Sequence, residues 1–341
     1  MKAVVFHEGS RWELAEVATL EPQPGEMLLK VLRTGVCGTD EHLLHGGFIA
    51  KLPLIPGHEI VGEVVGLGAG VEGIAVGTRV VVDNAIYCGE CPSCGRGEPL
   101  FCQRFVSLGC NAPGGFAEYV AVRASKAYLI GDLDIDVAVF AEPTACALHG
   151  IDVLNLRAAS HALIFGAGPT GLLLAQLLQM SGAASVTVAS PTRSKLELAQ
   201  RYGAHRVVQL KRGEPLASAD ELRAIAPDGF DAVIEATGVP ELLELGVSLT
   251  RIGGTVMVYG VAAEQATASI RPYEIFSREL TIKGSFAQAN CIGRALFALK
   301  SGRITNEGMI TSTGGLSTFD RALANLHDSE HIKTVFSPSA N

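Results

Sequence analysis

The stretch Leu163-Ile-Phe-Gly-Ala-Gly-Pro-Thr-Gly171 decides the fold of the second half of the chain. An apolar strand-like run enters a Gly-x-Gly-x-x-Gly turn, and an apolar helix-like run follows it. The first glycine permits a tight turn, the second lets the backbone approach a pyrophosphate, and the third lets the helix pack on the strand. The motif alone is weak evidence, but in this context it predicts a dinucleotide site at Gly166, Gly168, Pro169, Thr170 and Gly171.

The pattern of strand-like and helix-like runs changes at about residue 152. Strand-like and helix-like runs alternate over 152–283, which indicates βαβ units and a parallel sheet. Residues 1–151 contain short strand-like runs separated by turns, which suggest a small barrel-like domain. We expect the tail, 284–341, to pack back on that first domain. The sequence therefore predicts an α/β protein with two domains, which suits a length of 341 residues.

Composition limits the classes of function. The chain is 48% hydrophobic and 18% charged with 39 glycines, which is typical of a turn-rich α/β enzyme. A net charge of −8 without basic runs argues against a nucleic-acid partner. The apolar run at the N-terminus is too short for a signal peptide, and glycines, a proline and glutamines interrupt the apolar run 162–180. We therefore expect a cytoplasmic protein without a membrane partner.

The tip of the next strand predicts the choice of nicotinamide cofactor. In NAD enzymes a carboxylate about 20 residues beyond the fingerprint binds the ribose 2′-hydroxyl. Here that tip reads Ser190-Pro-Thr-Arg-Ser-Lys195 and has no acid. Ser190 and Thr192 are neutral donors, and Arg193 and Lys195 are cations that suit a 2′-phosphate. We therefore favour NADP(H) over NAD(H). Alternatively, the two cations are only the solvated first turn of the following helix.

Four cysteines, Cys88, Cys91, Cys94 and Cys102, lie close together in the segment 88–102. Four thiolates at this spacing form a closed tetrahedral site, which is typical of structural zinc. In a reducing compartment clustered cysteines favour a metal, with disulfides or an iron–sulfur cluster as alternatives. The other cysteines near or beyond this segment, Cys110, Cys146 and Cys291, lack partners at ligand spacing and are interpreted as buried thiols.

A second set of metal ligands lies in two turns near the N-terminus. Cys37 belongs to Thr34-Gly-Val-Cys-Gly-Thr-Asp-Glu-His42, and His58 and Glu59 follow the pair Pro56-Gly57. A thiolate, an imidazole and a carboxylate can hold a catalytic zinc and leave a fourth position open. For either segment alone, a buried free cysteine or an unrelated histidine is the alternative.

The motifs together resemble the zinc-dependent medium-chain dehydrogenase/reductase family over nearly the whole chain. The resemblance rests on Gly35-Val-Cys-Gly-Thr-Asp40, Gly57-His-Glu59 with Gly62-Glu-Val64, the four-cysteine segment, Gly115-Phe-Ala-Glu-Tyr119 and the turn 166–171. It implies a GroES-like β-barrel catalytic domain (1–151 and 284–341), a Rossmann domain (152–283) inserted in it, and an active site in the cleft between them. It also implies two zinc ions per subunit and a homo-oligomer, a tetramer or a dimer.

Within the family, Ala141-Glu-Pro-Thr-Ala-Cys-Ala-Leu-His149 is similar to the polyol dehydrogenases. Simple alcohol dehydrogenases place a cysteine ligand where this chain has Glu142. The resemblance implies that Cys37, His58 and Glu59 bind the catalytic zinc, with Glu142 as an outer or exchangeable ligand. It further implies that Thr39 contacts the substrate alcohol, that His42 relays the proton, and that Asp40 fixes the tautomer of His58.

These residue types predict the reaction. Zinc would lower the pKa of a bound alcohol, hydride would pass to the nicotinamide, and the proton would leave through Thr39, the ribose and His42. We expect a polyol, a sugar alcohol or the matching ketose as the small-molecule substrate. A secondary alcohol or threonine-type dehydrogenase would share every motif. A surface histidine is the alternative for His42, and the intact ligands disfavour a non-catalytic structural or nucleotide-sensing relative.

Overall fold

The computed structural model describes residues 1–339 and separates into two compact units. Unit 1 contains Met1–Ala145 and the chain from Gln288 onward, and unit 2 contains Cys146–Ala287. The expected limits were 151/152 and 283/284. Helix α4 (Ala141–Leu154) runs across the first of these limits, and Gln288 lies four residues beyond 284.

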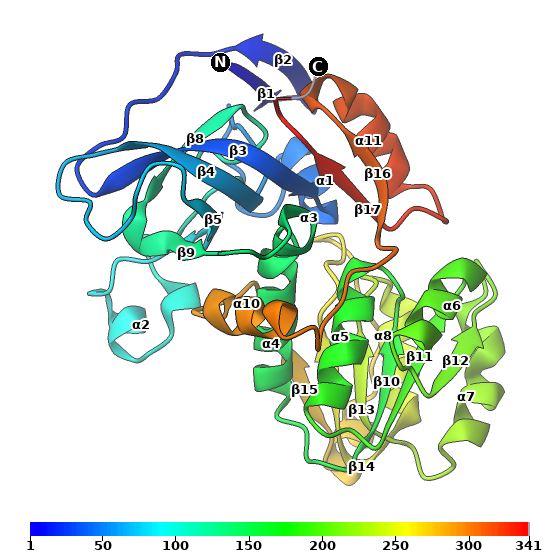
Figure 1. The fold of residues 1–341 in the computed structure, drawn as a ribbon. Helices are drawn as coiled ribbons and strands as arrows, with labels where there is room; N and C mark the ends of the chain where they lie inside the picture. The colour runs from blue at the N-terminus through cyan, green and yellow to red at the C-terminus, as the bar shows by residue number, and fades with distance from the viewer. Residues whose placement is uncertain (340–341) are drawn as a thin grey trace. The chain divides into compact units, whose positions relative to one another are not determined.

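Unit 1 is built on a seven-stranded sheet in which the last strand of the chain, β17, pairs with the early strand β3 (Figure 1). The strand order is β16-β17-β3-β4-β5-β9, and β8 also pairs with β3. The strands are β3 (Glu26–Val36), β4 (Glu59–Leu67), β5 (Arg79–Val82), β8 (Tyr119–Arg123), β9 (Ala127–Leu129), β16 (Ile310–Gly314) and β17 (Lys333–Phe336). Strand β17 runs antiparallel to β3 and places Phe336 opposite Thr34. The last strand of the chain, β17, therefore lies beside the turn that carries Cys37.

Alternation along the strands of unit 1 builds its core. In β3 the side chains of Met27, Leu29 and Val31 are buried, while the residues between them are partly exposed, as expected for period-two pleating. A second cluster is aromatic, and Phe116 lies 5.4 Å from Phe336 between ring centroids in an edge-on arrangement. Such ring pairs add specific geometry to the burial of large apolar surfaces.

Smaller elements complete unit 1. The strands outside the large sheet are β1 (Lys2–His7) paired with β2 (Arg11–Glu16), and β6 (Ala85–Ile86) paired with β7 (Val106–Ser107). The helices are α1 (Gly38–Leu44), α2 (Pro92–Gly95), α3 (Ile135–Ala138), α10 (Ile292–Lys300) and α11 (Phe319–Leu326). Short 3-10 turns are η1 (Pro99–Phe101), η2 (Ala124–Lys126) and η4 (Leu316–Thr318).

Unit 2 is a parallel sheet with the strand order β12-β11-β10-β13-β14-β15. The strands are β10 (His161–Phe165), β11 (Ser185–Ser190), β12 (Arg206–Gln209), β13 (Phe230–Glu235), β14 (Thr250–Val258) and β15 (Thr281–Gly284). The helices are α5 (Pro169–Met180), α6 (Arg193–Arg201), α7 (Ala219–Ile225), α8 (Pro240–Leu249) and α9 (Pro272–Ser277), with the turn η3 (Pro215–Ser218). The predicted α/β fold with a Rossmann-type parallel sheet is confirmed.

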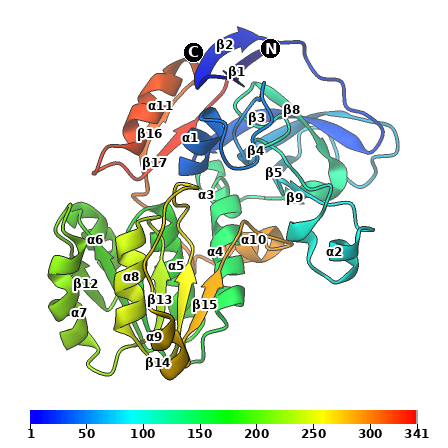
Figure 2. The same ribbon diagram turned by 180° about the vertical axis from the view of Figure 1, so that it is seen from behind.

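The sheet of unit 2 reverses its strand order beside β10. Helix α5 packs on β10 and β11, whereas α8 packs on β13 and β14 (Figures 1 and 2). The apolar run 162–180 forms β10, the glycine turn and α5, which confirms the predicted strand-turn-helix. In parallel sheets of this kind, ligands bind beyond the carboxyl ends of the strands at the point of reversal.

One helical stretch in residues 1–339, Ile135–Leu154, is long and apolar enough to cross a membrane by composition alone. Its mean hydropathy is 1.4, but 72% of the window is buried inside the protein. A stretch buried to this extent behaves as a core helix, so its composition gives only weak evidence for a membrane span.

Candidate active site

The pairing of β3 with β4 brings the first metal-ligand set together. Cys37 directly follows β3 and caps helix α1, and its backbone N–H donates to Asp40 Oδ2 over 2.8 Å. His58 and Glu59 lie where β4 begins, and Gly35 lies opposite Glu59 in the antiparallel register. The ligand atoms of Cys37, His58 and Glu59 all lie within 4.8 Å of one another. The two turns singled out in the sequence therefore meet at one end of the sheet.

Gly57 has to be glycine at the turn before His58. Its φ is +92°, and a Cβ there would lie 2.3 Å from the Phe116 ring. The backbone of the following loop closes onto this turn, because Gly115 N–H donates to the Gly57 carbonyl over 2.7 Å. This packing fixes the direction in which the His58 ring leaves the backbone.

His58 is buried beside two groups that favour its protonated form. Its Nδ1 lies 3.5 Å from Asp40 Oδ1, and neither atom has a hydrogen-bond partner among the described residues. Burial lowers the pKa of His58, but the Cys110 thiol and the Asp40 carboxylate outweigh burial and raise that pKa well above its ordinary value. Sequence spacing gave no sign of the Cys110 contact, because the loop that carries Cys110 folds back onto the Gly57 turn.

Glu59 is held by a residue that sequence reasoning missed. Lys333, in the closing strand β17, places its Nζ 2.5 Å from Glu59 Oε1, and the two side chains are only 3% and 1% exposed. Glu59 attracts the ammonium strongly enough that the pKa of Lys333 is raised, although burial alone lowers it. The only signal in the sequence was a lysine at the start of the short closing strand Lys333–Phe336.

The free side of Glu59 fits a metal ion. Within the described chain, Oε2 of Glu59 is buried without a hydrogen-bond partner. A Cβ on Gly35 would lie 1.8 Å from this oxygen, so only glycine leaves it room. A thiol, an imidazole and a bare carboxylate oxygen, all converging within one small space, are the donor set of a catalytic zinc site.

The other predicted catalytic residues lie on two helices. Thr39 Oγ1 is 3.6 Å from Cys37 Sγ, in the first turn of α1. His42 follows Thr39 by three residues on the same helix, so both side chains share one face. Glu142 is buried in the first turn of α4 and is not part of the three-ligand group. The roles assigned to these three residues stay predictions.

The four-cysteine segment forms a compact sulfur cluster around α2. The sulfur of Cys91 is 3.5 Å from that of Cys94 and 3.9 Å from that of Cys102, and Cys102 is 3.5 Å from Cys88. These separations are far too long for disulfides. All four sulfurs lie within 4.8 Å of one another, which fits a closed tetrahedral metal site.

Backbone amides favour the thiolate form in this cluster. Amide donors from Glu90 and Cys91 outweigh burial and lower the pKa of Cys88 to about 6. Burial and the neighbouring sulfurs raise the pKa of Cys94 to about 12. The amide of Arg104 also donates to Cys102 Sγ over 3.3 Å. A bound cation would stabilise all four thiolates at once, since metal ligation deprotonates thiols.

The glycine turn of unit 2 has the geometry of a pyrophosphate cradle. Gly166 has a φ of +109°, and its N–H donates to the Ala189 carbonyl over 2.8 Å. A Cβ on Gly171 would lie 2.1 Å from the Gly166 carbonyl oxygen, whereas none of the described atoms lies within 4 Å of a Cβ built on Gly168. Gly168 therefore leaves open space at the start of α5, where Pro169 and Thr170 follow.

The tip of β11 carries the residues predicted to select the cofactor. Ser190 ends the strand and is buried, and Thr192 precedes helix α6. Arg193 points along that helix, where its Nε lies 3.1 Å from Glu197 Oε1, and Lys195 is half-buried. A further cation, Arg212, comes from the turn after β12, and its Nη2 donates to Thr192 Oγ1 over 3.3 Å. Sequence reasoning missed Arg212.

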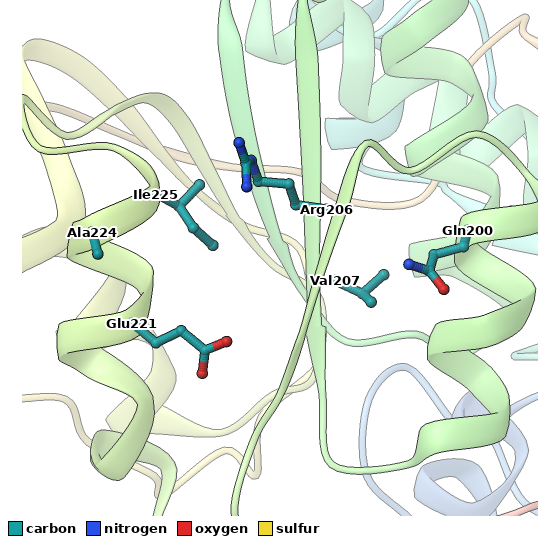
Figure 3. Close-up of a pocket in the computed structure, with 6 residues that line it drawn as sticks. All are labelled: Gln200, Arg206, Val207, Glu221, Ala224 and Ile225. Atoms are coloured by element: carbon teal, nitrogen blue, oxygen red, sulfur yellow. The ribbon is translucent and has the colours of Figure 1, made fainter.

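A hollow of about 410 Å³ lies elsewhere in unit 2 and is not part of the candidate site. It is lined by Gln200, Arg206, Val207, Glu221, Ala224 and Ile225, from α6, β12 and α7 (Figure 3). Arg206 is the first residue of β12, so the hollow lies at the amino end of that strand. The nucleotide turns follow the carboxyl ends of the strands.

Known proteins resemble this chain along nearly its whole length. Residues 23–132 match the family described as "Alcohol dehydrogenase GroES-like domain", and residues 169–300 match "Zinc-binding dehydrogenase". The chain is 42% identical to D-arabinitol dehydrogenase 1 of Uromyces fabae, over 92% of this chain and 90% of that protein. It is 37% identical to D-altritol 5-dehydrogenase of Agrobacterium fabrum, over 88% of each. A zinc-binding dehydrogenase, so described, from Sinorhizobium meliloti 1021, solved bound to NADP, has a TM-score of 0.93 at 35% identity and 99% coverage of both chains.

Proposed function

The chain belongs to the zinc-dependent medium-chain dehydrogenase/reductase family, in its polyol branch, and we propose that it transfers hydride between a polyol or sugar alcohol, or the matching ketose, and NADP(H). It is an NAD(P)-dependent alcohol or polyol dehydrogenase, as its named relatives and the two matched families indicate. The observation that carries the proposed chemistry is the converging group of Cys37, His58 and Glu59.

We propose that each subunit holds two zinc ions. Cys37, His58 and Glu59 would hold the catalytic ion, with Glu142 as an outer or exchangeable ligand, and the structural ion would be held by Cys88, Cys91, Cys94 and Cys102. The catalytic ion supplies a Lewis acid that lowers the pKa of a bound alcohol. Thr39 would then accept the alcohol proton while it gives up its own, which would leave through the cofactor ribose and His42 to solvent. Asp40 would orient the His58 ring through its carboxylate.

NADP(H) is the cofactor that the tip of β11 favours. The loop from Ser190 to Lys195 contains no carboxylate that would repel a 2′-phosphate. Ser190, Thr192, Arg193 and Lys195 offer hydroxyl and cationic donors there. The bound NADP of the Sinorhizobium meliloti protein supports this choice, because that protein matches nearly the whole of this chain.

We also propose a cytoplasmic homo-oligomer, a tetramer or a dimer. Strand β15 is the last strand of the unit 2 sheet, and most of its residues are exposed. Tyr273 and Phe276, on the neighbouring helix α9 of the chain, are 74% and 79% exposed. An unpaired strand edge and large exposed aromatic side chains are features that association with another subunit would cover.

A matrix of substrates and cofactors tests the proposed reaction. The purified zinc-loaded protein would be assayed with pentitols, hexitols, simple secondary alcohols and L-threonine, each with NADP and with NAD. We expect the highest kcat/KM with a polyol and NADP. A clear preference for L-threonine or for a simple secondary alcohol would replace the polyol assignment, and a preference for NAD would replace the cofactor assignment.

Glu142→Gln tests the polyol-type ligand arrangement. We expect a loss of kcat of about a hundredfold or more, in the range for loss of a group that orients a proton transfer, while the catalytic zinc stays bound through the other three ligands. Metal content and kcat are measured together on the same preparation. Glu241→Gln is the matched control, because Glu241 also lies in the first turn of a helix, but in α8 of unit 2. Turnover of Glu142→Gln equal to that of this control would show that Glu142 is only a helix-capping charge.

A further inference from the structure

The turn 211–214 lies beside the tip of β11 because of the register of two parallel strands. Strand β12 pairs with β11 so that Gln209 lies opposite Ser190. The pairing continues one residue further, since Leu210 N–H donates to the Ser190 carbonyl over 3.0 Å. The chain leaving β12 therefore enters the turn directly next to the position where the ribose 2′-substituent of a bound dinucleotide lies in such folds.

The turn separates its two cations. Glu214 N–H donates to the Lys211 carbonyl over 3.1 Å, and Gly213 has a φ of +77°, as the third position of a type II turn requires. Lys211 is neutralised within the turn, where its Nζ lies 2.6 Å from Glu214 Oε1. Arg212 forms no ion pair with any described residue, and it reaches back to Thr192 instead.

The contact between Arg212 and Thr192 leaves most of the guanidinium available. A guanidinium carries five N–H donors, and the Thr192 hydroxyl accepts from one of them. The remaining donors keep the fork geometry that binds phosphate oxygens in pairs. Thr192 thus holds the guanidinium at the strand tip before any cofactor arrives, which reduces the conformational entropy lost on binding.

Arg193 is less well placed for the same task. Its guanidinium is paired with Glu197 one turn further along α6, and its side chain is 77% exposed. A partner carboxylate reduces the positive potential that a phosphate would meet. Arg212 is exposed as well, but its contact is with the neutral hydroxyl of Thr192. The charge of Arg193 is therefore partly neutralised before a phosphate binds. The charge of Arg212 is not neutralised by a neighbouring carboxylate among the described residues.

We propose that Arg212 is the main residue that selects NADP(H), by binding the 2′-phosphate together with the Ser190 and Thr192 hydroxyls. This inference rests on the proposed use of NADP(H). It assigns the cofactor specificity to the turn that follows strand β12. Arg193 and Lys195 would add a weaker attraction to the phosphate that solvent screens. The predicted outcome is a loss of discrimination when Arg212 is removed, with the rest of the dinucleotide site intact.

Direct binding measurements test the proposal without relying on turnover. The zinc-loaded protein would be titrated calorimetrically with NADPH, NADH, 2′-AMP and 5′-AMP. We expect Arg212→Ala to weaken NADPH and 2′-AMP about ten- to a hundredfold, the range of a charge-assisted hydrogen bond, and to change NADH and 5′-AMP less than about twofold. Arg212→Lys should recover part of the loss through its charge. Lys211→Ala is the matched control, since it removes the neighbouring cation of the same turn.

Each outcome separates the inference from the proposed function. A wild-type protein that binds NADH more tightly than NADPH overturns the cofactor assignment itself. If the wild type prefers NADPH but Arg193→Ala, and not Arg212→Ala, removes that preference, the cofactor assignment stands and the role of Arg212 is refuted. Equal weakening of NADPH and NADH in Arg212→Ala would make the residue a support of the loop. Arg212→Gln, which keeps donors without charge, decides the point if the alanine variant is unstable.

Discussion

Lys333→Met is expected to destabilise the metal-depleted protein by about 3–5 kcal/mol, the cost of leaving one partner of a buried ion pair alone. The reason lies in the position of Glu59, which is 1% exposed and which pairs with the Lys333 ammonium at 2.5 Å. Methionine keeps the length and apolar stem of lysine but supplies no donor. The buried carboxylate must then stay charged without a partner or take up a proton, and both states cost free energy.

Zinc should reverse much of this loss. A metal at the Cys37 site offers Glu59 another positive partner on its Oε2 side, which is bare in the described chain. The destabilisation by Lys333→Met should therefore be clearly larger after chelator treatment than in the zinc-loaded protein. Thermal denaturation with and without zinc measures both values, and Lys333→Arg, which keeps the charge, should stay near the wild type. An equal loss in both states would mean that Glu59 does not face the metal.

A double mutant sharpens this experiment. Lys333→Met combined with Glu59→Gln removes both charges, so the unpaired-carboxylate penalty disappears and part of the stability of the metal-depleted protein should return. The same double mutant should bind zinc more weakly, because one of its three charged or strongly donating ligands is gone. Relative to Lys333→Met, the double mutant should thus be more stable without metal and bind zinc more weakly. A simple packing defect at Lys333 would not produce this pair of changes.

The sequence predicted the ligands of the catalytic site because their signals are local. His58 follows Gly57, whose φ of +92° favours glycine, and Gly35, two residues before Cys37, leaves no room for a Cβ beside Glu59. Such turn chemistry can be read from a few neighbouring residues. Lys333 could not be found in this way, since it lies 274 residues from Glu59 and meets it only through the pairing of β17 with β3.

The nucleotide site shows the same division between local and long-range information. The glycine turn at 166–171 and the acid-free tip at Ser190 follow from the order of residues along one strand-turn-helix unit. Arg212 belongs to the next unit and reaches the tip because parallel strands align their exits. The residues between β11 and the first turn of α6 therefore pointed to Arg193. In the structure its guanidinium is paired with Glu197.

Cys94→Ser is expected to remove one of two zinc ions and to lower the free energy of unfolding by about 4 kcal/mol or more, a size typical of losing a structural metal. Cys94 lies 3.5 Å from Cys91 and 4.0 Å from Cys88, so its loss opens one side of the sulfur cluster. A hydroxyl binds zinc poorly compared with a thiolate, and folding of the segment 88–102 depends on metal binding if the site is structural. Metal analysis and thermal denaturation would be measured on one preparation.

The comparison with Cys37→Ser gives this experiment its sharpest form. Both variants should contain one zinc per subunit. Cys37→Ser should lose turnover, but its melting temperature should stay near that of the wild type, because its site is built on paired strands of the main sheet. Cys94→Ser should instead lose stability, and its oligomeric state should shift if Phe101, which is 65% exposed in the same segment, lies at a subunit contact. Cys146→Ser is the control for losing a thiol outside both ligand sets. Native stability and assembly of a one-zinc Cys94→Ser protein would show that the sulfur cluster binds metal without supporting the fold.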